Sequence, residues 1–466
     1  MSDEVEMTAK GGILIRGAQS LALTGVGGIT LVGNAIWRFT DFRASFTQAY
    51  LKGTGGIPWG DVLIPYVASL CTGKSDYEAL RPWQGESWVA KALRVDRVGS
   101  PETVRQHLDN LADGHLKEAL ALVGQANLDL LRRSNAPITP CKTGHVCLDV
   151  DTTPQDNGKT KKEGVTRTYM PDVFGFAPIF ACAGEEGWCI NDEFRIGKQH
   201  GQKGAPAFLK ESIQRLRDLG VASILARLDS AFDAAENFLL FREEGVDFLV
   251  KGNPSHMRWP KWQEEAEALP KNAWKSVGRN LRVAYLSREE TREFDDKLIS
   301  VRRVLKVTKK LAWTLKDVPR GHRLLIKRYM VYESESWVTS LALSGDSTRE
   351  LYCQHATAEQ YHSEFKSELD LERMPSGNFK TNALILRLGT FAYNVLRLLG
   401  ILGKDVMAYR HPAKRRRMRT IIQEMIMVPA RVLTGSGQLK LDIGSDLPGR
   451  SAFLALHKSL AASLDE

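Results

Sequence analysis

The chain has 466 residues, which is too long for one ordinary hydrophobic core, so we expect about two to four domains. It is 43% hydrophobic and 26% charged, a composition typical of a soluble globular protein. Lys and Arg number 64 against 55 Asp and Glu, and this net charge of +9 favours a polyanionic partner, nucleic acid before membrane. The six cysteines form no Cys-x-x-Cys pair, which argues against a zinc module and a disulfide framework.

The first part of the chain, up to about Ala136, has a mostly helical pattern. Ser100-Pro101-Glu102-Thr103 predicts a helix start, with Ser as the N-cap and Pro in the first helical position. Small helical bundles near the N-terminus of a basic protein often bind DNA, although they are more often scaffolding. We therefore expect residues 1–140 to form a helical N-terminal DNA-binding domain.

At Gly144 the pattern changes to alternating strands and helices. The expected order is strand, strand, strand, helix, strand, helix, strand. These elements are predicted at 145–151, 173–182, 188–196, 205–219, 222–228, 234–244 and 246–251. The order matches an α/β core of the ribonuclease-H-like type, and this match is an analogy of fold only. Residues 141–255 are thus predicted to be the first part of a catalytic core.

Residues 256–348 are predicted to be a β-rich insertion that interrupts this core. Its expected strands are 281–287, 298–307, 323–333 and 337–343, and its many Lys and Arg residues are either a solvated surface or a surface that follows phosphates. The second part of the core, 349–402, includes a long apolar helix at 381–400. Residues 403–466 are a basic C-terminal region, expected to be helical in part, whose cationic cluster comprises Arg410, His411, Lys414, Arg415, Arg416, Arg417 and Arg419.

The most informative motif is the frame Tyr352-x2-His355-x3-Glu359-x6-Lys366. On an α-helix these four side chains would fall within an arc of roughly 60°. A carboxylate beside a phenol, an imidazole and an ammonium suits a metal ion next to a phosphate. A polar stripe on a helix is more often only a solvated face, so the interpretation of this frame as part of a metal site depends on the acidic residues upstream.

Two such residues stand at predicted strand ends. Asp149 and Asp151 share one face of the first core strand, because strand side chains alternate, so periodicity does not choose between them. We prefer Asp151, which stands where the strand ends and a site opens, with Asp149 as a helper. Asp229 follows a buried apolar run and is predicted at the carboxyl edge of the sheet, although it could equally cap the next helix.

If Asp151, Asp229 and Glu359 meet, their mutual repulsion calls for cations. Two Mg²⁺ ions, with Mn²⁺ expected to substitute, would meet that need and serve in-line phosphoryl transfer. The sequence has no Walker-type loop, so we expect no nucleotide cofactor.

Together these residues resemble the DDE-type insertion-sequence transposases, specifically the transposase DDE domain group 1 family, whose neighbours include cut-and-paste enzymes with a Tyr-Arg-Glu-Lys signature. The resemblance covers about residues 140 to 400. Its pieces are Leu148 to Thr153, Arg227 to Phe232, the frame from Tyr352 to Lys366, Arg373-Met374-Pro375-Ser376, and Asn382 with Ala392-Tyr393-Asn394.

This resemblance implies that Asp151, Asp229 and Glu359 bind the metals and that Tyr352 and Lys366 hold the DNA backbone at the transposon end. One position departs from the family frame, which has Arg where this chain has His355. A neutral imidazole lacks the fixed fork and permanent charge of Arg, which puts the strength of end binding in doubt. The further DNA-binding residues that we expect are Arg373, Arg415, Arg416 and Arg417. The family's β-insertion is expected to lie along the DNA, where an aromatic residue such as Trp313 or Trp337 could receive a flipped base, although strand tryptophans are more often core.

The sequence therefore predicts a DNA transposase that binds the terminal inverted repeats of its own element, cuts them with metal-activated water and transfers the cut strand to a target. We accordingly expect double-stranded DNA as the partner, a homodimer in the synaptic complex, and no membrane partner. The expected location is the bacterial cytoplasm, in association with the nucleoid. The alternatives are a catalytically silent DNA-binding relative and another ribonuclease-H-like endonuclease.

Overall fold

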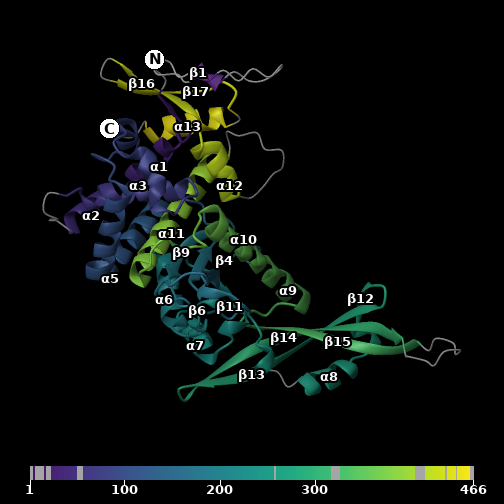
Figure 1. Ribbon diagram of the computed structural model, residues 1–466. Coiled ribbons are helices and arrows are strands. Elements are labelled where there is room, and N and C mark those ends of the chain that lie inside the picture. The colour runs from purple at the N-terminus through teal and green to yellow at the C-terminus, as the bar shows by residue number, and fades with distance from the viewer. Residues whose placement is uncertain are drawn as a thin grey trace, which may run out of the picture. The chain divides into compact units, whose positions relative to one another are not determined.

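The computed structural model describes residues 4–5, 15–16, 22–49, 56–256, 259–315, 326–404, 415–435, 438–447 and 449–461. The chain divides into two compact units. The first consists of Met1–Ser134, Glu368–Asp370 and Phe391–Glu466, and the second of Asn135–Ser367 and Leu371–Thr390. The five domains predicted from the sequence remain a prediction, and Figure 1 labels the elements of both units.

The first unit is mainly helical. Its principal helices are α1 (Ile29–Phe39), α2 (Phe42–Ala49), α3 (Trp59–Cys71), α4 (Ser87–Leu93), α5 (Pro101–Arg133), α12 (Met418–Ile421) and α13 (Arg450–Ala461). Helix α5 begins where the sequence predicts, because the Ser100 hydroxyl accepts the Thr103 N–H at 3.2 Å and Pro101 takes the first helical position. A small antiparallel sheet joins β17 (Gln438–Ile443), β16 (Ala430–Gly435) and β3 (Leu23–Thr24).

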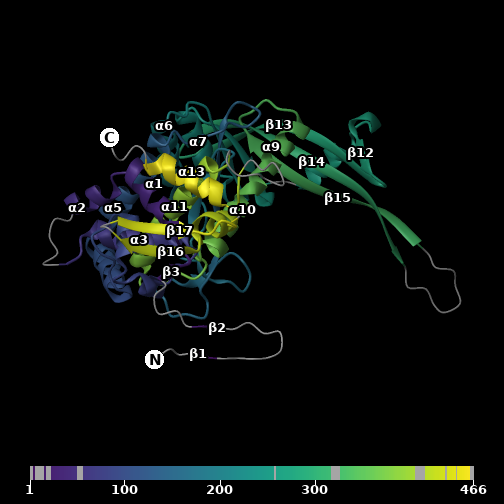
Figure 2. The ribbon, with the colours of Figure 1, turned by 90° about the horizontal axis from the view of Figure 1, so that it is seen from above.

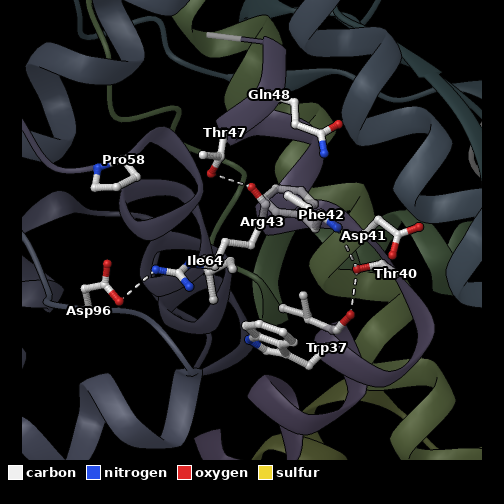
Figure 3. Close-up of a pocket in the computed structure, with 12 residues that line it drawn as sticks. Trp37, Thr40, Asp41, Phe42, Arg43, Thr47, Gln48, Pro58, Ile64 and Asp96 are labelled. Atoms are coloured by element: carbon white, nitrogen blue, oxygen red, sulfur yellow. Dashed lines mark hydrogen bonds and ion pairs between the residues drawn. The ribbon is translucent and has the colours of Figure 1, made fainter. Parts of the chain in front are cut away.

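Helices α1, α2 and α3 also line a cavity of about 540 Å³ (Figure 3). Arg43 on α2 forms ion pairs with buried Asp61 on α3 and, at 2.9 Å, with Asp96. The other labelled polar and aromatic residues of its lining are Trp37, Thr40, Asp41, Phe42, Thr47 and Gln48. None of the predicted site residues lies in this cavity, so it is not the predicted catalytic site.

The second unit is built on one mixed sheet of nine strands in the order β12-β13-β14-β15-β11-β10-β4-β8-β9. Its core strands are β4 (Val146–Thr152), β8 (Ile179–Ala183), β9 (Trp188–Glu193), β10 (Ile224–Leu228) and β11 (Asp247–Lys251). β4, β10 and β11 are parallel to one another, whereas β8 and β9 are antiparallel neighbours. Helices α6 (Ala205–Asp218) and α7 (Ala235–Glu243) connect these strands in the predicted alternating order and pack on β9 and β11.

One core strand was predicted too long. The predicted strand 173–182 is two strands, β7 (Phe174–Phe176) and β8, separated at Ala177-Pro178. Pro178 has no N–H to give to a strand ladder, which favours a break at that point. β7 instead joins a small sheet with β5 (Gln155–Asp156) and β6 (Thr166–Arg167) directly after β4.

The predicted β-rich insertion consists of β12 (Lys275–Gly278), β13 (Leu281–Phe294), β14 (Lys297–Leu315) and β15 (Ile326–Thr339), with helix α8 (Trp259–Glu267) before them. The strands are much longer than predicted, and 323–333 and 337–343 are largely one strand, of which residues 323–325 lie outside the described residues. β15 pairs with β11, so the insertion extends the core sheet (Figure 2).

The helical stretch that carries the frame is not one regular α-helix. It consists of α9 (Gly345–Cys353), a 3₁₀ turn (Gln354–Ala356), α10 (Thr357–Ser363) and a π-helical turn (Glu364–Glu368). The single arc calculated for Tyr352, His355, Glu359 and Lys366 assumed one uniform twist, and the 3₁₀ and π turns change that twist. The four frame residues therefore do not lie on one regular α-helix.

Helix α11 (Phe379–Leu402) corresponds to the long apolar helix predicted at 381–400. It is long and apolar enough to cross a membrane by length and composition, yet 94% of its most apolar window is buried inside the protein. A core helix passes the same test of length and composition, and this burial is typical of one.

Candidate active site

Asp151 and Asp229 stand side by side at the carboxyl ends of two parallel strands. β4 and β10 pair in register with Val150 opposite Leu228, so the next residue on each strand is an aspartate. Asp229 also accepts the Ala231 N–H at 3.0 Å and caps a short 3₁₀ helix, so the capping role considered from the sequence is present as well. The sheet thus brings together two of the three predicted carboxylates.

The charges of the other two predicted carboxylates, Asp229 and Glu359, both act on Asp151. Burial and then the negative charge of Asp229 raise the pKa of Asp151 to about 7, whereas His355 and the Thr152 N–H lower it and Glu359 adds the smallest raising effect. Burial also raises the pKa of Asp229. A carboxyl group whose ionised form is disfavoured in this way is stabilised by a nearby cation.

Glu359 itself lies on α10 with an exposed side chain. Among the described residues, no three His, Cys, Asp or Glu side chains are arranged closely enough to hold a metal ion. Asp229 and Glu359 act on Asp151 through their charges, and carboxylate oxygens suit a hard divalent cation. Their role as metal ligands remains a prediction.

Asp149 has a different environment from Asp151. Both of its oxygens accept hydrogen bonds of 2.7 Å from Arg227, and His355 Nδ1 lies 2.7 Å from Asp149 Oδ1 (side chains 2%, 6% and 9% exposed, respectively). Although burial opposes the charged form, Arg227 and His355 keep the pKa of Asp149 below its usual value. Arg227 and His355 thus occupy the Asp149 carboxylate, and the preference for Asp151 as a metal ligand remains a prediction.

His355 points inward to Asp149. Burial disfavours the imidazolium, but the hydrogen bond to Asp149 and the charges of Asp149 and Asp151 outweigh it, so the pKa of His355 is raised. Arg227 continues this buried chain by donating to the Leu351 carbonyl at 3.0 Å on the preceding helix. The His355 side chain thus ties the frame helix to β4, and its expected contact with DNA remains a prediction.

The other two frame residues also contact protein groups. Tyr352 packs beside His355 and Trp337, and burial followed by the charges of Asp229, Asp151 and Asp149 raises its pKa. Lys366 donates to the Pro154 carbonyl at 2.7 Å and lies 3.0 Å from Glu372. Lys366 thus anchors the π-helical turn to the segment that follows β4.

The remaining predicted DNA-binding arginines lie in both units. Arg373 is exposed in the second unit. In the first unit, Arg416 forms an ion pair with Glu424, and Arg417 lies 2.7 Å from Glu368. Arg415 is half-buried. Arg410, His411 and Lys414 lie outside the described residues.

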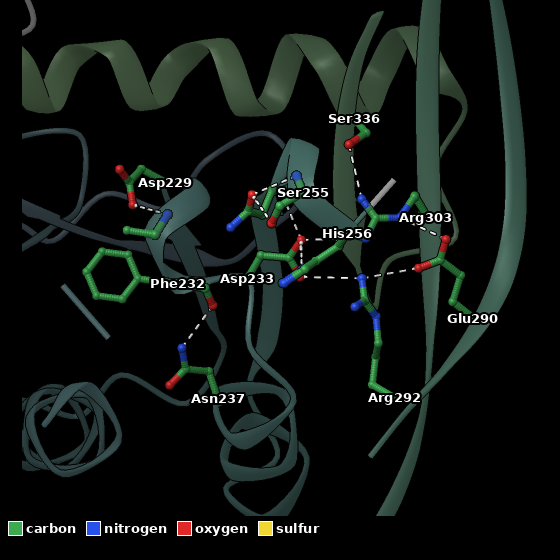
Figure 4. A network of polar contacts seen from close by, with 12 residues as sticks. Asp229, Phe232, Asp233, Asn237, Ser255, His256, Glu290, Arg292, Arg303 and Ser336 are labelled. Carbon is green, nitrogen blue, oxygen red and sulfur yellow. Dashed lines mark hydrogen bonds and ion pairs between the residues drawn. The ribbon is translucent and has the colours of Figure 1, made fainter. Parts of the chain in front are cut away.

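Four residues after Asp229, a buried network joins the end of β10 to the insertion (Figure 4). The Asp233 carboxylate accepts the Asn253 N–H at 2.8 Å and lies 3.3 to 3.6 Å from His256, Arg303 and Arg292. Arg303 on β14 is wholly buried and also binds Glu290 on β13 at 2.9 Å. The loop that carries Asp229 is therefore held against β13 and β14.

Sequence reasoning missed three residues around the carboxylates. Arg227 was noted only as an interruption in an apolar run. His362 stands one helical turn after Glu359, with Nδ1 3.7 Å from Asp151 Oδ2, and burial with the charges of His355 and Lys366 lowers its pKa to about 3. Tyr169 donates its hydroxyl to the Thr152 carbonyl at 3.2 Å. The spacing Glu359-x2-His362 could have identified His362, whereas no pattern marks Tyr169.

Comparisons with known proteins identify the family of this chain. The family described as "Transposase DDE domain group 1" matches residues 138–464. Among solved structures, the chain is similar to a piggyBac transposase synaptic complex with hairpin DNA, at 12% identity and a TM-score of 0.41, over 94% of this chain and 82% of that one. The comparison with curated proteins found no match. Because the family match spans well over half of the chain, the protein belongs to the transposase DDE domain group 1 family.

Proposed function

We propose that this protein is a DNA transposase that binds the ends of its own element, cuts them in a metal-dependent reaction and joins the cut ends to target DNA. The observation that carries the proposal is the pairing of Asp151 and Asp229 on neighbouring parallel strand ends, with the charge of Glu359 reaching Asp151. Carboxyl ends of parallel strands are where the sites of open α/β sheets form.

The order β9-β8-β4-β10-β11 supports a ribonuclease-H-like core, with β4 central and the two aspartates on adjacent strands. The net charge of +9 suits DNA as the partner. In this proposal Tyr352, Lys366 and Arg373, all in the second unit, contact backbone phosphates of the DNA. Arg415, Arg416 and Arg417 extend the basic surface of the first unit. Two element ends must be held together, so we propose a homodimer in the synaptic complex, acting in the bacterial cytoplasm on the nucleoid.

Asp151, Asp229 and Glu359 would hold two Mg²⁺ ions, which Mn²⁺ could replace. When bound, such ions activate a water or a 3′-hydroxyl and stabilise the leaving oxygen. The exposed side chain of Glu359 allows it to approach the two aspartates without disturbing the buried sheet. Asp149, Arg227 and His355 hold the frame helix against β4, so their part is to position Glu359 relative to Asp151.

The test is cleavage and joining of DNA that carries the element's ends. Purified wild-type protein with Mg²⁺ is expected to release the element and join its 3′ ends to a target plasmid, whereas Asp151→Asn, Asp229→Asn and Glu359→Gln are expected to bind the ends and lose at least about 10³-fold in cleavage. Joined products separate a transposase from another endonuclease of the same fold. A folded wild-type protein that binds the ends and never cuts them would reject the proposal.

The absence of a formed three-ligand set among the described residues favours one alternative, a DNA-binding relative without catalysis. Metal binding separates the two. Isothermal titration with Mn²⁺ in the presence of end DNA is expected to show binding that Glu359→Gln weakens. A silent relative would bind the DNA with no such Mn²⁺ site.

A further inference from the structure

The loop between β6 and β7 carries an exposed aromatic and apolar surface next to the two aspartates. Tyr169 is 65% exposed, and Met170 and Phe174 are 45% and 46% exposed. Exposed apolar side chains are ordinary when they stand singly, but two on one short loop and a third on the first residue of β7 call for a partner.

Tyr169 connects this loop to the candidate active site. Its hydroxyl donates to the carbonyl of Thr152, the residue that follows Asp151. Burial of the hydroxyl end, followed by the charges of Asp151 and Asp229, raises the Tyr169 pKa to about 12. The hydroxyl end therefore faces the carboxylates, whereas the ring presents most of its surface to solvent.

The loop is held in this form by its own hydrogen bonds. The Thr168 N–H and hydroxyl both donate to the Val173 carbonyl, at 2.9 and 3.0 Å, and the Met170 N–H donates to the Thr168 hydroxyl at 3.2 Å. A ring fixed before binding loses little conformational freedom when a flat partner stacks on it. The β6–β7 loop is therefore a preformed platform.

The chemistry beside the platform identifies the partner. If the aspartates act on a phosphodiester, the nearest flat groups are the bases attached to that strand. Bases in a paired duplex are stacked inside it, so only an unstacked base can lie on an exposed ring. Arg167, exposed and paired with Phe174 across β6 and β7, supplies a cation for the same strand's phosphate.

The tryptophan considered from the sequence is less suitable. Trp337 is 1% exposed, and it packs against Tyr352 with Lys251 over its ring at 5.0 Å. A base could stack on Trp337 only if that packing opened. The side chain of Trp313 lies outside the described part of the chain.

We propose that Tyr169, with Met170 and Phe174 beside it, receives an unstacked base of the DNA strand whose phosphodiester lies at Asp151 and Asp229. The proposal rests on the proposed function, since it takes DNA to be the substrate. It assigns the β6–β7 loop as a determinant of where the DNA opens at the cleaved end.

The test measures binding without cleavage, with Ca²⁺ in place of Mg²⁺. The probes are a fluorescein-labelled duplex of the element's terminal DNA and a set of the same duplex with one mismatched pair, moved stepwise across the end. A mismatch at one or two neighbouring positions is expected to raise wild-type affinity by about 5- to 100-fold, the range that stacking on one aromatic ring supplies. Tyr169→Ala is expected to lose this gain, and Tyr169→Trp to keep it.

Phe294→Ala is the control, because Phe294 is another exposed aromatic (45%, against 65% for Tyr169) at the end of β13, and it is expected to keep the gain. Thermal unfolding checks that each variant is folded. A wild-type protein without a position-specific gain, or a Tyr169→Ala protein that retains it, would overturn the platform. A protein that shows the gain and never cuts with Mg²⁺ would support the platform and reject the proposed cleavage.

Discussion

Asp149 and Asp151 are two residues apart on one strand, and the structure predicts opposite effects of the same substitution at the two positions. Asp149→Asn removes the anion that two Arg227 nitrogens and His355 contact at 2.7 Å. Removing one partner of a buried ion pair costs about 3–5 kcal/mol, because the other charge stays buried without compensation. At about 2–4 °C per kcal/mol for a unit of this size, the unfolding midpoint should fall by roughly 6–20 °C.

Asp151→Asn should have the reverse effect on stability. The folded protein raises the pKa of Asp151 to about 7, so the ionised form is disfavoured and stability from this group is lost as the pH rises from about 4 to 7. At pH 8 without divalent cations, neutral Asn should therefore leave the midpoint unchanged or raise it, while abolishing cleavage.

Differential scanning calorimetry of the wild type and both variants at pH 8 in EDTA is the assay. The reasoning is refuted if Asp149→Asn unfolds within about 2 °C of the wild type, or if Asp151→Asn loses as much as Asp149→Asn. The first outcome would mean that the Asp149 oxygens are not committed to Arg227 and His355 in solution, and the second that the ionised form of Asp151 is not disfavoured in the folded protein.

Three further predictions concern pH, the insertion and the frame lysine. Because the pKa of His355 is raised, its contribution to folding stability is fully present below about pH 6.5 and is lost as the pH rises through the folded-state pKa. The wild type should therefore lose stability in that window. His355→Gln should show a flatter dependence of the unfolding midpoint on pH in thermal melts from about pH 6 to 9. Asp233→Asn removes a buried carboxylate beside the wholly buried Arg303, which keeps its pair with Glu290, and should lower stability by about 1–3 kcal/mol in urea unfolding. Glu243→Gln, which breaks only an exposed pair, should cost less than about 1 kcal/mol, and equal losses would contradict the burial argument. If Lys366 grips a phosphate, Lys366→Met should reduce the slope of log affinity against log salt by about 1 in DNA titrations, whereas a role limited to its protein contacts would lower the unfolding midpoint and leave the slope unchanged.

The positions of Asp151 and Asp229 could be predicted because strand signals are local. The apolar run at 222–228 became β10 (Ile224–Leu228), buried throughout, and the alternating run at 145–151 became β4. Asp151 is the last residue of its run and Asp229 directly follows the other run, so both were expected near the end of a strand. That the two strands are neighbours in matching register follows from the sheet, which a single sequence pattern does not encode.

The different surroundings of Asp149 and Asp151 could not be predicted from the strand pattern alone. Both lie on one face of β4, and only the partner strand shows that Arg227 stands opposite Asp149. An arginine within an apolar run looks like a flaw in a strand prediction, yet here it is a buried cation with a buried anion as its partner.

The insertion and the frame helix show where local patterns fail for different reasons. Strand length in the insertion is set by pairing, since β13, β14 and β15 match residue for residue far beyond their apolar segments. The frame helix contains 3₁₀ and π turns whose positions depend on the groups that they pack against, such as the Lys366 contact with Pro154. A helical wheel of fixed period cannot represent either effect.

His355 gives the departure from the family frame a physical meaning. An arginine at this position would have a permanent charge and a longer side chain. His355 is short enough to remain against Asp149, whose hydrogen bond and negative charge favour the protonated imidazole. Arg227 already supplies one permanent cation to Asp149, whereas the imidazole of His355 adds a second positive charge only when it is protonated. The link between the frame helix and β4 should therefore weaken when His355 loses its proton, and Glu359, four residues further on, would lose part of the support that positions it relative to Asp151.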